Sequence, residues 1–130
     1  MQIQNAGTVG GNLCNASPAA DGVPALLALE AEVEIASLRG VRRVGLADFV
    51  LGSRRTALAR DELLVAIRVP DWPDRSRATF LKLGHRRYLV ISVAMVAATI
   101  AVDADGRVAR CAIAVGACSA VARRLRALED

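Results

Sequence analysis

The stretch that decides the fold is Gly7-Thr8-Val9-Gly10-Gly11-Asn12, close to the first residue of a 130-residue chain. Glycine lacks a Cβ atom, so the backbone amides of this stretch can approach a ligand closely. The threonine and asparagine side chains add further hydrogen-bonding groups, and the stretch is therefore a candidate anion-binding nest centred on Gly10 and Gly11. Its composition, continued to Asn15, favours a loop that exposes its amides over a regular element.

The spacing of these glycines matches neither of the two common nucleotide-binding loops. It is not the GxGxxG of dinucleotide-binding folds, and it is not the GxxxxGK[ST] of P-loops. On glycine content alone, a tight turn that binds nothing is the simpler interpretation. Asp21, which follows the stretch, suits a hydroxyl or amide donor better than a phosphate, because like charges repel.

The composition describes a globular chain with few large side chains. Apolar residues make up 54% of the sequence but aromatic residues only 3%, so the core must be built from Ala, Val, Leu and Ile. The formal net charge is +4, yet the basic residues are not gathered into one block. A nucleic-acid-binding surface would combine a basic stripe with stacking aromatic rings, and the aromatic residues here are scattered: Phe49, Trp72, Phe80 and Tyr88.

The cysteines and the apolar segments limit the compartment. Cys14, Cys111 and Cys118 are odd in number and form no CxxC pair, which argues against a disulfide framework, a structural zinc site or an iron–sulfur cluster. We expect them to be small core residues in a reducing cytoplasm. Residues 1–5 are polar, and the apolar segment 90–102 is too short to span a bilayer, so we expect neither a secretory leader nor membrane insertion.

Secondary structure in the first half follows from local patterns. Residues 21–29 predict a short helix that Asp21 caps and that holds Pro24 in its first turn. Alternating Glu32 and Glu34 with apolar residues predicts a hairpin. Its strands are expected at residues 31–37 and 41–46, followed by a single helical turn at 47–52 and a strand at 62–69 that Pro70 ends.

The second half begins after a polar, proline-flanked segment at residues 71–76, where we place a domain boundary near residue 75. Three strands are expected at residues 77–83, 90–103 and 107–117, and the turn 103–106 joins the last two as an antiparallel hairpin. Residues 120–128 predict the start of a helix. Its apolar stripe has no further element to cover it, which suggests a truncated chain.

One longer motif makes the glycine stretch specific. The run Gln4-Asn5-Ala6-Gly7-Thr8-Val9-Gly10-Gly11-Asn12-Leu13-Cys14-Asn15-Ala16-Ser17-Pro18-Ala19-Ala20-Asp21 resembles the second FAD motif of the xanthine dehydrogenase and aerobic carbon monoxide dehydrogenase flavoprotein family. The resemblance continues at residues 23–29, 61–64, 67–70, 80–83 and 114–118. It covers nearly the whole chain.

The resemblance implies an α+β fold in two parts. Residues 1–75 would be the second part of a PCMH-type two-subdomain FAD-binding domain, and residues 76–130 would start a carbon monoxide dehydrogenase flavoprotein C-terminal-like domain with a three-stranded antiparallel sheet and helices. It also implies the medium subunit of a molybdenum hydroxylase, which receives electrons from iron–sulfur clusters and passes them through FAD to NAD or a quinone-type acceptor. The implied partners are a large molybdopterin-binding subunit and a small 2Fe-2S subunit.

The same resemblance implies which residues contact the cofactor. Thr8, Val9, Gly10, Gly11 and Asn12 would grip the pyrophosphate and ribityl region of FAD, with Ser17 nearby and Asp21 holding a hydroxyl-bearing part. Leu64 and Lys82 match positions that line the flavin, although a core leucine and a solvated lysine are equally good interpretations. Tyr88 is a weaker candidate for a flavin neighbour. His85 has no partner for catalysis, and no residue is expected to act as acid, base or nucleophile.

The chain departs from the family in one respect. Relatives carry a first glycine-rich FAD motif before this region, and nothing here matches it. We therefore expect the chain by itself to supply half of the cofactor site and to bind FAD weakly or not at all. Two alternatives remain open at this stage: an assembly module that no longer binds FAD, and a binder of another nucleotide that ATP or GTP would compete for.

Overall fold

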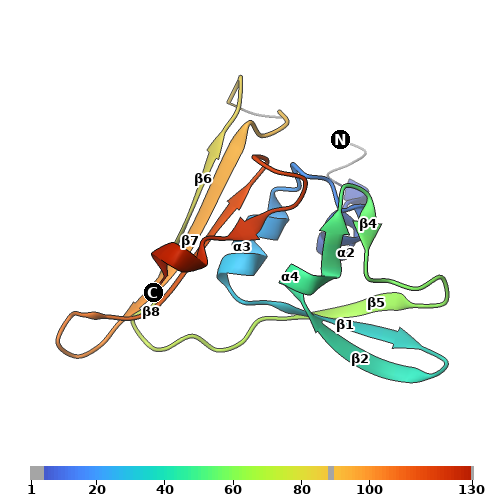
Figure 1. The fold of residues 1–130 in the computed structure, drawn as a ribbon, viewed down its shortest axis with the longest axis horizontal. Coiled ribbons are helices and arrows are strands. Elements are labelled where there is room, and N and C mark those ends of the chain that lie inside the picture. Colours follow the sequence, from blue (N-terminus) through green and yellow to red (C-terminus); the bar gives the residue numbers. More distant parts are fainter. Residues whose placement is uncertain (1–4, 88–89, 130) are drawn as a thin grey trace.

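The computed structural model describes residues 5–87 and 90–129, and within them the chain forms three antiparallel sheets with short helices between them (Figure 1). The elements are, in chain order, α2 (Val9–Asn15), α3 (Gly22–Ala28), β1 (Glu32–Ser37), β2 (Gly40–Gly45), α4 (Leu46–Phe49), β3 (Val50–Gly52), β4 (Arg55–Thr56), β5 (Leu63–Arg68), β6 (Arg77–Leu83), β7 (Ala94–Val102), β8 (Val108–Gly116), β9 (Arg123–Arg124) and the 3-10 helix η1 (Arg126–Leu128).

The first sheet has the strand order β2-β1-β5, and it confirms the predicted hairpin and the strand before Pro70. The turn between β1 and β2 ends at Gly40, whose φ of +126° is open to glycine and strained for other residues. Val33 and Ile35 point into the core, whereas Glu34 lies on the other face between Arg43 and Arg68. The alternation seen in the sequence therefore sets which face is buried.

The second sheet has the strand order β6-β7-β8-β9. The predicted strand at residues 77–83 is confirmed as β6, and the hairpin turn at 103–106 is closed by Asp103, whose Oδ1 accepts from the amides of Asp105 and Arg107 at 2.9 Å. The strand expected at residues 90–103 begins only at Ala94, because the residues before it form the connection from β6. The sheet has the three expected strands and the two-residue β9 as a fourth.

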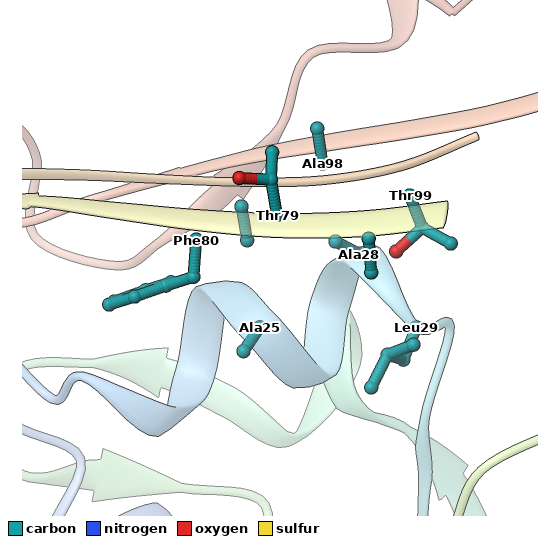
Figure 2. A pocket seen from close by; sticks show the side chains of 9 residues that line it. Ala25, Ala28, Leu29, Thr79, Phe80, Ala98 and Thr99 are labelled. Atoms are coloured by element: carbon teal, nitrogen blue, oxygen red, sulfur yellow. The ribbon is translucent and has the colours of Figure 1, made fainter. Parts of the chain in front are cut away.

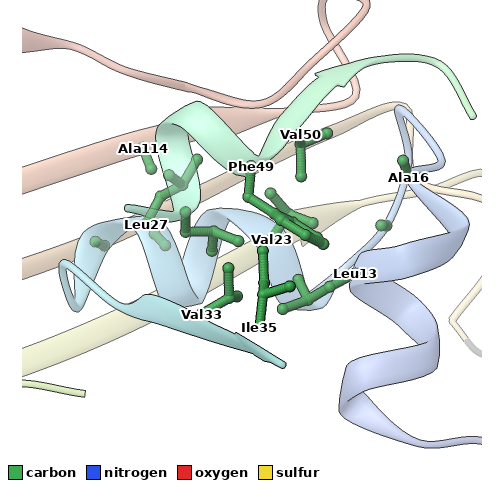
Figure 3. Close-up of a cluster of buried hydrophobic side chains, with 13 residues drawn as sticks. Leu13, Ala16, Val23, Leu27, Val33, Ile35, Phe49, Val50 and Ala114 are labelled. Carbon is green, nitrogen blue, oxygen red and sulfur yellow. The ribbon is translucent and has the colours of Figure 1, made fainter. Parts of the chain in front are cut away.

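The core lies where α3 meets the other elements (Figure 3). Its largest buried side chains come from the first part of the chain and are those of Phe49, Leu13 and Ile35. The strands β7 and β8 contribute the small buried residues Ala97 and Ala114. A Cβ atom at Gly116 would lie 2.5 Å from Cγ of Pro24, so glycine is needed for α3 to approach β8 this closely. The core thus extends across residue 75, and the boundary placed there stays a prediction.

The glycine stretch is not the loop that its composition predicted. Residues from Val9 onward form α2, and Thr8 is its N-cap, with φ −121° and ψ 156°. Two glycines cost a helix about 1 kcal/mol each relative to alanine, which is why the composition favoured a loop. Burial of Leu13 and the cap at Thr8 offset that cost.

Two further expectations about helices are wrong in their extent. Residues 120–128 were expected to start a helix, but they form β9 and η1, because Arg124 pairs with Ala114 on β8 and is held by ion pairs beneath α3. The turn at residues 47–52 is helical only to Phe49, after which Val50 starts β3 against β4. In both places tertiary pairing overrides the local helical preference.

The cysteines are free thiols, and the expectation that they are core residues is wrong for two of them. Cys14 and Cys118 are exposed and Cys111 is half-buried. Partial desolvation of the thiol nevertheless raises the pKa of Cys14, which disfavours the nucleophilic thiolate. No helix in the described part of the chain is long and apolar enough to cross a bilayer.

Candidate functional site

The first turn of α2 carries five of the predicted cofactor residues. Oγ1 of Thr8 accepts from the amide of Gly11 at 2.9 Å and closes the turn. A Cβ atom at Gly11 would lie 2.9 Å from that same oxygen, so the cap and the glycine require each other. Thr8, Val9 and Gly11 are exposed, and this turn therefore lies at the surface.

Gly10 and Leu64 lie close together. A Cβ atom at Gly10 would be 3.5 Å from Cδ2 of Leu64, which is ordinary van der Waals contact. Leu64 lies on β5 and packs against the core with part of its surface still exposed. α2 thus lies against β5 of the first sheet, while a direct contact between Leu64 and a flavin stays a prediction.

Asn12 holds the one polar side-chain atom in the described residues that is buried without a hydrogen-bond partner, its Oδ1. That oxygen faces Gly22, where a Cβ atom would lie 3.0 Å away. An acceptor left unpaired costs about 1–3 kcal/mol, and native proteins normally avoid the cost. This side chain is therefore the polar group of the motif that lacks a hydrogen-bond partner for its oxygen.

Ser17 belongs to the segment that connects α2 to α3. Its Oγ accepts from the amide of Ala19 at 3.3 Å, and the carbonyl of the next residue, Pro18, accepts from the amide of Ala117 at 3.2 Å. The carbonyl of Ala16 accepts from the amide of Arg54 at 2.9 Å. The segment is therefore tied to the turn between β3 and β4 and to the end of β8, and Ser17 is held close to α2.

Asp21 does not cap α3 with its side chain, contrary to expectation. The third residue of α3 is Pro24, which has no N–H to donate, and the amide of Val23 already donates to the carbonyl of Ala20 at 3.2 Å. The carboxylate is instead bound by Nζ of Lys82 at 2.6 Å and by Oγ of Ser92 at 2.7 Å. The structure thus brings Asp21 and Lys82 together across 61 residues of sequence.

Sequence reasoning missed Ser92, since a lone serine in an apolar run carries no chemical signal. It is 6% exposed and reaches Asp21 from the segment before β7. The exposed His85 stays without an assigned role. Tyr88, the weaker candidate for a flavin neighbour, lies outside the described residues.

An apolar cavity of about 210 Å³ lies between α3 and strands β6 and β7 (Figure 2). Its lining includes Phe80, Leu29 and several alanines, with Thr79 and Thr99 as the polar residues. No titratable side chain lines it, so it offers no acid, base or nucleophile. Within residues 5–87 and 90–129, no group of three or more His, Cys, Asp or Glu side chains could hold a metal ion.

Comparison with known proteins places this geometry in a family. Residues 1–72 match the family model described as the FAD binding domain in molybdopterin dehydrogenase. The nicotinate dehydrogenase FAD-subunit of Eubacterium barkeri is 43% identical over 109 residues, which are 81% of this chain and 36% of that protein. The nicotine 6-hydroxylase medium subunit of Paenarthrobacter nicotinovorans is 33% identical over 99% of this chain and 44% of its own length.

A solved structure carries the same fold. Reconstituted CO dehydrogenase from Oligotropha carboxidovorans superposes with a TM-score of 0.91 at 27% identity, over 98% of this chain and 44% of that one. The chain thus spans less than half the length of each of these three relatives. The α+β fold class, the resemblance stated from the sequence and FAD as the family's cofactor are confirmed. The chain belongs to the family of FAD-binding domains of molybdopterin dehydrogenases.

Proposed function

We propose that this chain is part of the FAD-binding, electron-transferring medium subunit of a molybdenum hydroxylase complex. The observation that carries the proposal is the Thr8-capped turn of α2, in which glycine backbone is exposed and a Cβ atom at Gly11 would lie 2.9 Å from Oγ1 of Thr8. Such a surface fits the close approach of a cofactor's polar backbone. The family match covers this turn and supports the same assignment.

Different residues would contact different parts of the cofactor. Thr8, Val9, Gly10, Gly11 and Asn12 would hold the pyrophosphate and ribityl region, with Ser17 beside them. Asp21 would accept a hydrogen bond from a hydroxyl of the cofactor, because its carboxylate is 48% exposed while bound to Lys82. Leu64 and Lys82 would lie along the flavin side of the site. When bound, FAD supplies the electron-accepting chemistry, and the protein binds and orients it.

The proposed partners are a large molybdopterin-binding subunit and a small 2Fe-2S subunit, with NAD or a quinone-type compound as the electron acceptor. Relatives named as a medium subunit and as a subunit of a dehydrogenase complex support an assembly of this kind. Three free thiols support a reducing compartment such as the cytoplasm. The substrate of the complex would be selected in the molybdenum subunit.

The test is an FAD titration of the complete subunit that contains this chain, followed by flavin fluorescence. In the Gly11→Ala variant the new methyl group must displace Oγ1 of Thr8, and we expect FAD affinity to fall about tenfold, or 1.4 kcal/mol. The control is Gly45→Ala, where φ is −58° and the nearest side-chain atom would lie 3.7 Å from the new methyl group. The control should bind FAD as the parent does.

The two alternatives give different results in the same titration. An assembly module without cofactor would show no FAD binding in the parent and no response to Gly11→Ala. A binder of another nucleotide would lose FAD when ATP or GTP is added. Retained FAD binding that is indifferent to Gly11→Ala would show that this turn does not contact the cofactor.

A further inference from the structure

Ser92 is a buried polar residue outside the motif segments on which the sequence resemblance rests. It lies two residues before β7, and its Oγ donates to Oδ1 of Asp21 at 2.7 Å although 71 residues separate the two in sequence. Hydrogen bonds to an ionised acceptor are roughly twice as strong as those between neutral groups. The Ser92 hydroxyl therefore makes a charge-assisted hydrogen bond to the carboxylate of Asp21.

The carboxylate of Asp21 is held at both oxygens. Oδ2 accepts from Nζ of Lys82 at 2.6 Å, and that nitrogen also donates to the carbonyl of Val90 at 2.9 Å. Two donors on different oxygens stop the carboxylate from turning about its own axis. Its exposed fraction of 48% leaves it open to a third donor from a ligand.

The position of Ser92 is itself fixed by the connection between β6 and β7. The amide of Val93 donates to the carbonyl of Leu83 at 2.8 Å, which closes the connection at its base. A Cβ atom at Gly84 would lie 2.6 Å from Cγ1 of Val90, so glycine allows the two ends of the connection to meet. Ser92 is thus presented from a defined backbone.

We propose that Ser92 is a positioning residue, which orients the carboxylate of Asp21 toward a hydroxyl group of FAD. The inference rests on the proposed function, because it needs FAD at this surface. Pro24 leaves the Asp21 side chain without its usual helix-capping partner, and Ser92 takes the place of that partner. Without Ser92, only Lys82 would hold the carboxylate of Asp21. Its Oδ1 would then have no donor and would no longer point in a fixed direction.

The experiment measures the FAD dissociation constant of the complete subunit by flavin fluorescence. Ser92→Ala should weaken binding about tenfold, since a bond to a charged group is lost. Ser92→Cys, of nearly the same volume and with a weak S–H donor, should lose less, about threefold. In an Asp21→Ala background, Ser92→Ala should have no further effect, because the group it orients is gone.

The matched control is Thr99→Ala, which removes a buried hydroxyl from β7, the strand that follows Ser92, without touching Asp21. It should bind FAD as the parent does. Parent-like binding in both Ser92 variants would overturn the inference and leave the proposed function standing. An equal loss in the Asp21→Ala background would also overturn it, as the sign of a general loss of structure. A parent subunit that binds no FAD would instead remove the proposed function.

Discussion

The two ends of α3 are both tied to the second sheet by charged side chains, yet they are built differently. At its start, Asp21 meets Lys82 with side chains 48% and 29% exposed. Beyond its other end, Glu30 meets Arg124, which is 7% exposed and also binds the 5% exposed Glu129. The charged pair at the start of α3 stays in contact with solvent, whereas the side chains of Arg124 and Glu129 beyond its other end are buried.

At the buried end, the guanidinium of Arg124 donates hydrogen bonds from all three of its nitrogens. Nε and Nη2 of Arg124 donate to the two oxygens of Glu129 at 2.6 and 2.7 Å, and Nη1 donates to the carbonyl of Leu27 at 3.2 Å. Arg110 pairs with Glu30 and lies 4.1 Å from the ring centroid of Trp72. In this network the charged groups are paired with one another, whereas Asp21 keeps an open side. We infer that one end stabilises the fold and the other serves the cofactor.

Arg124→Met should have the largest effect on stability. It keeps the length of the side chain but leaves Glu129 and Glu30 buried or half-buried with fewer donors. Breaking a buried pair by removal of one partner costs about 3–5 kcal/mol. Urea unfolding should show that loss, and the exposed neighbour Arg123→Met should change stability by less than about 0.5 kcal/mol. Equal effects of the two variants would mean that the network does not stabilise the fold.

Low pH should weaken the Arg124–Glu129 network beyond the C-terminal end of α3. The hydrogen bond from Arg124, followed by that from the amide of Ile113, lowers the pKa of Glu129 below its ordinary 4.5. A carboxylate with a lowered folded-state pKa contributes stability above 4.5 and loses it as pH falls through the folded-state value. Unfolding free energy should therefore drop from about pH 5 downward, and Glu129→Gln should make that drop shallower.

Arg124→Met supplies the cross-check for the acid experiment. Once Arg124 is replaced, Glu129 has lost the first cause of its lowered pKa, so Glu129→Gln should change the pH slope little in that background. Other carboxylates also contribute to the drop, among them Glu62, whose pKa the Arg42 hydrogen bond lowers to about 2. A slope that Glu129→Gln leaves unchanged in the parent would contradict the prediction.

The longer strands were predictable from sequence because alternation and turn residues act locally. The β1–β2 hairpin and the turn at Asp103 follow from patterns within a few residues. The segment 120–128 could not be predicted in the same way. Its β9 pairing and its Arg124 contacts depend on α3 and β8, which are distant in sequence, and these contacts outweigh local helix preference.

The same distinction between local patterns and contacts distant in sequence applies to the candidate site. The residues from Thr8 to Asn12 could be selected because a contiguous motif carries them, although their helical conformation could not. Pro24 explains, from sequence alone, why Asp21 cannot bond the amide three residues into the helix. Ser92 could not be found, because only the folding of the β6–β7 connection brings it to Asp21.

Lys82→Met should have the smallest effect on stability and thereby separates the two ends of α3. A solvent-accessible ion pair contributes less than about 1 kcal/mol, so urea unfolding should change little. FAD affinity should still fall, because Asp21 loses one of its two donors and the proposed site loses its cation. Arg77→Met, an exposed residue on the same strand, is the control for both measurements. If Lys82→Met destabilised the protein as much as Arg124→Met, the two ends would be alike in function, and Asp21 would be a structural residue.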